Sequence, residues 1–210
     1  MEASFWRQRW ADNQIGFHEA EPHTLLREPW PQLGLATGSR VFVPLCGKSH
    51  DMPWLREQGH AIVGNELAEI AVRDFFREHD MTAQQTRVGE FEVFASPGYE
   101  LLCGDYFALT QAAVGPFAAI NDRAALIALP PAMRREYATQ LGQLAPSGTR
   151  MLLITVEYDL SVISPPPFAV SADEVVEHYR AEWDIEDRGR RAALVKGVAG
   201  TEQVFVLTRH

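Results

Sequence analysis

Residues 40–48, RVFVPLCGK, and residues 61–67, AIVGNEL, decide the fold of this chain. Each stretch begins with a short apolar run, which predicts a strand, and ends in a turn that carries polar groups. Residues 50–58 and 67–78 then follow with the apolar spacing of a helix. A strand, a turn and a helix, repeated, are the unit of an α/β fold with a mainly parallel sheet.

The rest of the chain continues this alternation. The further elements that we expect are part of a hairpin at 91–94, strands at 99–103, 116–120 and 150–156, helices at 131–144 and 172–182, and strand-like runs at 192–196 and 204–208. Helices that connect parallel strands cover both faces of the sheet. We find no internal repeat and no linker, so residues 1–210 are predicted to form a single domain.

Composition restricts the partners. The chain has 210 residues and a formal net charge of −9, which disfavours nucleic acid and anionic membrane surfaces. Two cysteines in apolar contexts fit a reducing compartment and argue against a disulfide scaffold. The sequence lacks the apolar run of a signal peptide or a membrane span, so we expect a cytoplasmic protein.

Ligands of open α/β sheets lie beyond the carboxyl ends of the strands. Glu66 ends the second strand, 19 residues after Gly47, where nucleoside-binding folds place the acid that binds ribose hydroxyls. An acidic residue that favours the dipole of the following helix is an equally good interpretation from spacing alone. The turns after the next strands carry Asp105-Tyr106 and Asp122-Arg123, and the latter pair also reads as a structural ion pair or helix cap.

The first turn has one glycine, Gly47, and lacks the three glycines that admit the pyrophosphate of a dinucleotide. A P-loop is excluded because Phe42 stands where its first glycine belongs. Cys46 is interpreted as a small core residue rather than a nucleophile. The histidines show no metal-binding pattern, so no metal is expected.

Aromatic residues gather near the N-terminus, where Trp6, Trp10 and Phe17 lie close in sequence. They either pack a core helix or form a lid over a ligand.

Together these motifs resemble the thiopurine S-methyltransferase family in its shorter bacterial form. The segments that carry the resemblance, in order along the whole chain, are Phe5-Trp6 with Trp10, Gly16-Phe17-His18, residues 41–48, residues 63–67, Asp122-Arg123 with Ala125-Leu126, and residues 165–168. The sequence departs from the family pattern at Asn65, where a small apolar residue is usual, and at Ala124, where glycine is frequent.

The resemblance implies a class I methyltransferase (Rossmann-like) fold, with a seven-stranded mixed sheet whose last strand is antiparallel. It implies S-adenosylmethionine as methyl donor and, as acceptor, the sulfur of a small thiol or thiopurine, with selenium or tellurium compounds also plausible. A monomer is expected. The site residues that it implies are Trp10, Leu45, Glu66 and Arg123 for the cofactor, Asp105 and Tyr106 for its adenine, Trp6 and Phe17 in a lid of residues 1–22, and Arg190 or Arg191 for the acceptor.

Methyl transfer from a sulfonium needs mainly alignment and exclusion of water. Arg123, with Asp122, is the predicted catalytic group, because a cation favours the acceptor thiolate or holds a water that takes the proton.

Two alternative functions stay open, a nicotinamide-dependent oxidoreductase on a similar sheet and a non-catalytic nucleoside-binding protein. The single glycine of the first turn argues against the former, and retention of Glu66, Arg123 and Trp10 argues against the latter.

Overall fold

The computed structural model describes residues 3–210, and within them nine strands form one sheet in the order β3-β4-β5-β2-β1-β6-β7-β9-β8. The strands are β1 Arg40–Val43, β2 Ala61–Glu66, β3 Gln84–Val88, β4 Phe91–Ser96, β5 Tyr99–Cys103, β6 Ala119–Arg123, β7 Arg150–Tyr158, β8 Trp183–Val195 and β9 Val198–Arg209. The helices are α1 Ala3–Ala11, α2 Thr24–Arg27, α3 Asp51–Glu57, α4 Glu69–Glu78, α5 Gln111–Val114, α6 Pro131–Leu144 and α7 Ala172–Tyr179, with short 3-10 helices at Trp30–Leu33, Tyr106–Ala108 and Leu126–Ala128.

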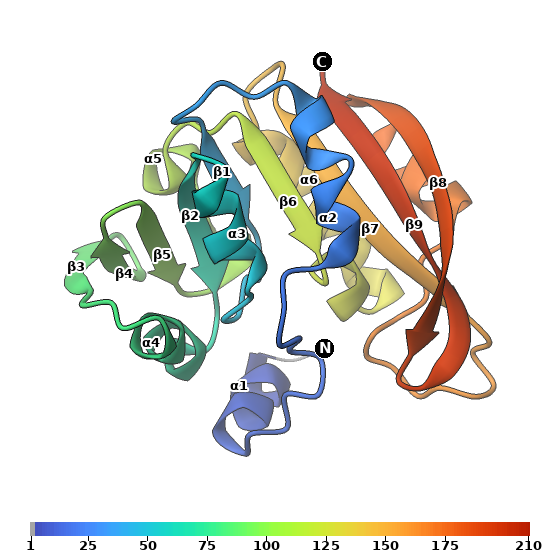
Figure 1. Ribbon diagram of the computed structural model, residues 1–210, viewed down its shortest axis with the longest axis horizontal. Coiled ribbons are helices and arrows are strands. Elements are labelled where there is room, and N and C mark those ends of the chain that lie inside the picture. The colour runs from blue at the N-terminus through green and yellow to red at the C-terminus, as the bar shows by residue number, and fades with distance from the viewer. Residues whose placement is uncertain (1–2) are drawn as a thin grey trace.

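Helices cover both faces of the sheet, as the sequence predicts (Figure 1). On one face, Tyr137 of α6 and Val175 of α7 belong to the core that includes Phe42 of β1. On the other face, α2, α3 and α4 contribute to a core that includes Val41 of β1. Neighbouring residues of one strand thus enter opposite cores, which is why β1 reads as a continuous apolar run.

The predicted count of seven strands is wrong. The strands β5, β2, β1, β6 and β7 are parallel, and β9 is antiparallel to β7, as expected. The two additional strands come from the hairpin of β3 and β4, which extends the sheet beyond β5. All five residues of β3 are exposed, so this edge strand lacks the apolar alternation that would predict a strand from sequence.

The strand predicted at 116–120 lies three residues further on, at Ala119–Arg123. Asp122 and Arg123 are therefore the last residues of β6 rather than part of the turn that follows it. Asn121 and Asp122 are buried in spite of their polarity. These polar residues concealed the end of the strand.

The order of the strands reverses at β1, which lies between β2 and β6. Helix α1 lies beyond the end of the sheet toward which β2 and β6 point (Figure 1). This is the edge at which open α/β sheets bind ligands. Within residues 3–210, none of the helices is both long and apolar enough to cross a membrane.

Candidate active site

A cavity of about 430 Å³ opens at the switch point of the sheet. Its walls come from the ends of β1, β2, β6 and β7, from the N-terminal segment, from Pro166-Pro167, and from the turn between β8 and β9. The volume is in the range of small-molecule sites. Segments that are far apart in the sequence therefore meet around one candidate ligand site.

Glu66 forms part of the cavity wall at the end of β2. Its Oε2 accepts a hydrogen bond from the Gly47 amide at 2.8 Å, and its Oε1 accepts one from the Ala68 amide at 2.8 Å. Burial raises the pKa of Glu66, against the lowering effect of these backbone hydrogen bonds. A carboxylate has lone pairs for further donors, so an anchored Glu66 can still accept from ribose hydroxyls.

The turns at the ends of β1 and β6 have strained backbones. Leu45 has a φ of 46°, Gly47 of 52° and Ala124 of 65°, all in the left-handed region. For a residue with a side chain this conformation costs roughly 1–2 kcal/mol. The strain at Ala124 explains why glycine suits this position, and all three residues line the cavity.

The N-terminal segment covers one side of the cavity with aromatic rings. Trp6 and Trp10 each make an edge-on contact with Phe17, with ring centroids 5.5 Å apart. Trp10 is buried against Ala68, which precedes α4, and against Ala71 of α4. It lies directly over Gly47, where a Cβ atom would approach its Cζ2 to 3.0 Å. The aromatic rings thus line the cavity, and a lid role for this segment stays a prediction. Met1 and Glu2 of the predicted lid lie outside the described residues.

Arg123 lines the other half of the cavity and is held by several partners. Its Nε donates to Oδ2 of Asp51 at 2.7 Å, and its Nη2 donates to Oγ of Ser49 at 2.8 Å. Nη1 lies 3.8 Å from Oε2 of Glu19. The guanidinium is thus a charge with acidic neighbours, not an isolated cation.

A contact between His23 and Glu202 ties the N-terminal segment to β9. The Nε2 of His23 lies 3.0 Å from Oε1 of Glu202, and the His23 amide donates to Oδ1 of Asp51 at 2.8 Å. The Leu25 amide donates to Nδ1 of His23 at 3.3 Å. In neutral His23 this bond makes Nδ1 the acceptor, so Nε2 carries the proton that His23 donates to Glu202. Burial lowers the pKa of His23, but the hydrogen bond and the charge of Glu202 outweigh burial and leave the pKa above its usual value.

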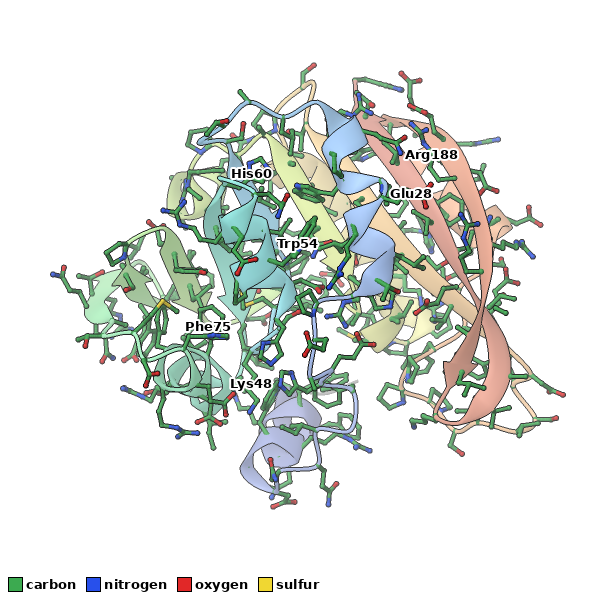
Figure 2. The ribbon with its side chains drawn as sticks, in the orientation of Figure 1. Glu28, Lys48, Trp54, His60, Phe75 and Arg188 are labelled. Carbon is green, nitrogen blue, oxygen red and sulfur yellow. The ribbon has the colours of Figure 1, made fainter. Side chains whose placement is uncertain are left out.

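Lys48 lies where the end of β1 approaches α1 and α4 (Figure 2). Its Nζ is 2.7 Å from Oε1 of Glu78, the last residue of α4. His18 of the N-terminal segment stacks on His50, with centroids 5.2 Å apart. Burial and the nearby Lys48 lower the pKa of His18, which favours its neutral form.

The cysteines have no place in this chemistry. Cys46 is buried and Cys103 is half-buried. Burial raises the pKa of both thiols, that of Cys103 to about 11. A thiol with a raised pKa is a poor nucleophile at neutral pH. The structure agrees with the interpretation of Cys46 as a core residue.

Comparison with known proteins decides the family. A family model described as thiopurine S-methyltransferase matches residues 1–209. A thiopurine S-methyltransferase of Pseudomonas putida is 50% identical over 186 residues, which cover 89% of this chain and 86% of that protein. One of Pseudomonas syringae is 48% identical over 217 residues, which cover 100% of this chain and 99% of the relative. The chain belongs to the thiopurine S-methyltransferase family.

Solved structures agree on the fold. A SAM-dependent methyltransferase of Anabaena variabilis has a TM-score of 0.69 at 12% identity, over 99% of this chain and 95% of that one. Magnesium protoporphyrin IX methyltransferase of Synechocystis, with bound S-adenosylhomocysteine, has a TM-score of 0.67 at 11% identity, over 100% of both chains. The class I methyltransferase fold is confirmed.

Members of the thiopurine S-methyltransferase family use S-adenosylmethionine, and this chain is an enzyme of that kind. Membership decides against both alternatives, the nicotinamide-dependent oxidoreductase and the non-catalytic nucleoside-binding protein. The cavity fits the cofactor, because it joins an anchored carboxylate at Glu66 to a turn at Gly47 on which Trp10 lies.

The cavity brings together six of the residues that the family resemblance implies. They are Trp6, Trp10, Phe17, Leu45, Glu66 and Arg123. Asp105 and Tyr106, predicted at the adenine, do not line it in the described part of the chain. The Oδ1 of Asp105 accepts from the Phe107 amide at 3.0 Å, and Tyr106 is buried with its hydroxyl donating to the Tyr137 carbonyl. Adenine binding at these two residues stays a prediction.

Asp122, Arg190 and Arg191 also lie away from the described cavity wall. Asp122 is buried, where its Oδ2 accepts from the Tyr137 hydroxyl at 2.8 Å and its Oδ1 accepts from the Leu126 amide at 3.1 Å. Arg190 of β8 pairs with Glu157 of β7, across the intervening β9, and Arg191 lies 4.0 Å from Glu28. Neither arginine reaches the acceptor side in this conformation.

Sequence reasoning missed the titratable residues that surround Arg123. Asp51, His23, Glu19 and Glu202 all line the cavity. Asp51 had a usable signal, because it is an acid directly after the first turn. His23 and Glu202 are 179 positions apart and had none.

The Asn65 departure from the family pattern also has a structural reason. Its Nδ2 donates to the carbonyls of Leu102 and Gly104, each at 3.1 Å, and so ties the end of β2 to that of β5.

Proposed function

We propose that this enzyme transfers a methyl group from S-adenosylmethionine to the sulfur of a small thiol, with thiopurines in the accepted class and reduced selenium or tellurium compounds as further acceptors. The observation that carries the proposal is the single cavity that runs from Glu66 and Trp10 to Arg123 and the turn between β8 and β9. Relatives about half identical to this chain are named thiopurine S-methyltransferase, which supports the sulfur acceptor.

The half of the cavity near β1 and β2 is assigned to the donor. Glu66 would accept from the ribose hydroxyls, while Leu45 and Gly47 form the turn beneath the ligand and Trp10 covers it. S-adenosylmethionine supplies an activated methyl group on a sulfonium. The aromatic faces of Trp10 and Phe17 favour a cation nearby and exclude water.

The half of the cavity near β6 and β7 is assigned to the acceptor. Its walls include Ile127, Ile154, Val156 and Val195, so an apolar body fits there. Catalysis by these residues consists of holding the acceptor sulfur in line and dry.

The structure changes the role that we assign to Arg123. Because Asp51 and Glu19 balance its charge, Arg123 stabilises a thiolate less than an isolated cation would. We assign it to positioning Asp51, Ser49 and a water. Glu19 and Glu202 are the carboxylates available to take the proton that leaves the acceptor sulfur.

Purified protein, labelled S-adenosylmethionine and a panel of thiols, thiopurines and selenols test the proposal. We expect label in the thioether or selenoether product and binding of S-adenosylhomocysteine in calorimetry. Binding without transfer to any sulfur or selenium acceptor would contradict the proposed acceptor. Cytoplasmic location and a monomeric state are part of the proposal, and the latter is checked by light scattering.

A further inference from the structure

Three histidine rings lie in a row beside the cavity, from the N-terminal segment to the end of α4. His18 stacks on His50 with ring centroids 5.2 Å apart, and His50 makes an edge-on contact with His79 at 5.4 Å. His18 lines the cavity, His50 directly precedes α3, and His79 directly follows α4. The row therefore joins the segment that covers the cavity to two helices that pack on the sheet.

The rings of His18 and His50 are not paired with an acid. None of the carboxylates in residues 3–210 forms an ion pair with either ring. By contrast, His23, His178 and His210 lie 3.0, 3.3 and 3.4 Å from a carboxylate oxygen. Protonation of His18 or His50 would therefore place a charge in the stack without a partner to stabilise it.

The surroundings of His18 oppose its protonation. Burial has the largest effect, and the charges of Lys48, His50 and Arg123 act in the same direction. The charge of Glu78 favours protonation, but its carboxylate is already engaged by the Lys48 ammonium at 2.7 Å. The pKa of His18 lies below its usual value as a result. The stack is an arrangement of neutral rings.

The carboxylates next to the stack in the sequence are engaged by Arg123. Glu19 lies 3.8 Å from Nη1 of Arg123, and Asp51 accepts from its Nε at 2.7 Å. Neither carboxylate is therefore free to turn toward a protonated imidazole without giving up a cation that it already has.

The far end of the stack has the same preference for the neutral form. Burial and the charge of His50 lower the pKa of His79, and they outweigh the opposite effects of Glu78 and Asp80. A proton on the middle ring would thus meet an unfavourable environment on both sides.

We propose that His18 is a positioning residue for the donor half of the cavity: as a neutral ring stacked on His50 it holds the N-terminal segment in place, and its protonation releases the segment. Phe17, the preceding residue, contacts Trp10, which lies over the first turn. His18 therefore acts through Phe17 and Trp10 and not on the reacting atoms. The inference rests on the proposed function, since it concerns the segment that we assign to covering the donor.

The direction of the pH dependence follows from the two forms of the segment. In the released segment His18 has its ordinary pKa of 6.5, and in the docked segment its pKa is lower. The released form therefore binds more protons between these two values. Docking is strongest above pH 6.5 and weakens as the pH falls below this value.

The first test is the Kd of S-adenosylhomocysteine, measured by calorimetry at pH 7.5 and at pH 5.5. His18→Phe keeps a ring that can stack on His50 but cannot be protonated. We expect the ratio of the two dissociation constants in wild type to exceed that in His18→Phe by about threefold or more. His18→Gln also cannot be protonated but loses the ring, so it should bind more weakly than His18→Phe at pH 7.5.

The second test is hydrogen exchange without ligand, corrected for the intrinsic effect of pH on exchange. In wild type, residues 3–20 should be less protected at pH 5.5 than at pH 7.5, whereas His18→Phe should show equal protection. The matched control is His210→Gln, which replaces a histidine that lies beside Asp184 and outside the described cavity wall. It should show the wild-type pH dependence in both tests.

Equal ratios of the dissociation constants in wild type and His18→Phe overturn the proposal. Equal protection of residues 3–20 at both pH values in wild type overturns it as well. Failure of the proposed function has a different signature, because then no thiol, thiopurine or selenol is methylated at pH 7.5. If S-adenosylhomocysteine does not bind at either pH, the exchange experiment alone decides the role of His18.

Discussion

Arg123 and Asp51 form an ion pair that is nearly closed off from solvent. The Nε of Arg123 is 2.7 Å from Oδ2 of Asp51, and the two side chains are 10% and 1% exposed. Burial raises the pKa of Asp51, but the charge and hydrogen bond of Arg123 outweigh this and leave the pKa below its usual value. The pair joins the first residue of α3 to the last residue of β6, across the switch point of the sheet.

Arg123→Ala is expected to destabilise the protein as well as the site. The substitution leaves the Asp51 carboxylate buried without its partner, which costs about 3–5 kcal/mol in the free energy of unfolding. Asp51→Asn in the same chain should restore part of this loss. Urea denaturation of the two single variants and the double variant gives the coupling free energy.

Arg135→Ala is the control for this prediction. Arg135 pairs with Glu177 on the surface, where the side chains are 69% and 60% exposed. Its loss should cost less than about 1 kcal/mol. If Arg123→Ala also lowers the free energy of unfolding by less than about 1 kcal/mol, burial of the Asp51 carboxylate does not depend on the guanidinium.

Gly47→Ala tests whether Trp10 closes over the first turn. A Cβ at this position strains the backbone, whose φ is 52°, and approaches Trp10 to 3.0 Å. Gly148→Ala carries the same type of strain, with a φ of 81°, but has nothing within 4 Å of its Cβ. We expect both variants to lose roughly 1–2 kcal/mol of stability.

The two glycine variants should differ in ligand binding. Only Gly47→Ala should weaken binding of S-adenosylhomocysteine and speed hydrogen exchange in residues 3–20, since only this change displaces Trp10. Calorimetry and exchange mass spectrometry measure the two effects. Equal affinity in both variants would mean that Trp10 packs here for stability alone.

The sequence predicted the central parallel strands because their residues are buried on both faces and read as apolar runs. The edge strands β3 and β8 were missed in whole or in part because most of their residues are exposed. Of the 13 residues of β8, only Trp183 and Val195 are buried, so the expected run at 192–196 is only the end of a long strand. A strand whose residues are mostly exposed, whichever face they lie on, lacks the apolar alternation that pattern reading needs.

The position of Glu66 on the cavity wall was predictable, whereas the contact between His23 and Glu202 was not. Glu66 follows a strand at a spacing that has a known geometric meaning, and the structure places it on the cavity wall. His23 and Glu202 meet only because β9 returns antiparallel to β7 and brings its first half beside the N-terminal segment. Long-range pairs of this kind carry no local signal.

Glu66→Ala is expected to weaken binding of S-adenosylhomocysteine by about 1.5–3 kcal/mol, which is roughly tenfold or more, because a carboxylate acceptor is lost. Stability should also fall, since the amides of Gly47 and Ala68 lose their acceptor. Glu69→Ala removes an acid from the first turn of α4 and tests the helix-dipole alternative. If the two variants bind the ligand equally well, Glu66 serves the helix and not the ribose.

Asp122→Asn separates a buried structural acid from a catalytic one. Burial raises the pKa of Asp122 to about 6, while the hydrogen bonds from Leu126 and Tyr137 lower it. The unfolded chain has a pKa near 3.8, so the folded form binds more protons between these values. The stability that Asp122 contributes is therefore complete below pH 3.8 and is lost as the pH rises through about 6.

Asp122→Asn removes this titration. As the pH rises from 4 to 7, the free energy of unfolding of the variant should therefore increase relative to that of wild type, by at most about 3 kcal/mol. The measurement is urea unfolding at several pH values, with kcat/KM for an aryl thiol at pH 7.5. Asp184→Asn, at an 83% exposed side chain, is the control and should show no such trend.

Because Asp122 lies outside the described cavity wall, Asp122→Asn should keep its activity within about threefold. The amide oxygen of the new side chain can still accept the hydrogen bond from the Leu126 amide. A loss of two or more orders of magnitude in a folded variant would return Asp122 to the catalytic group.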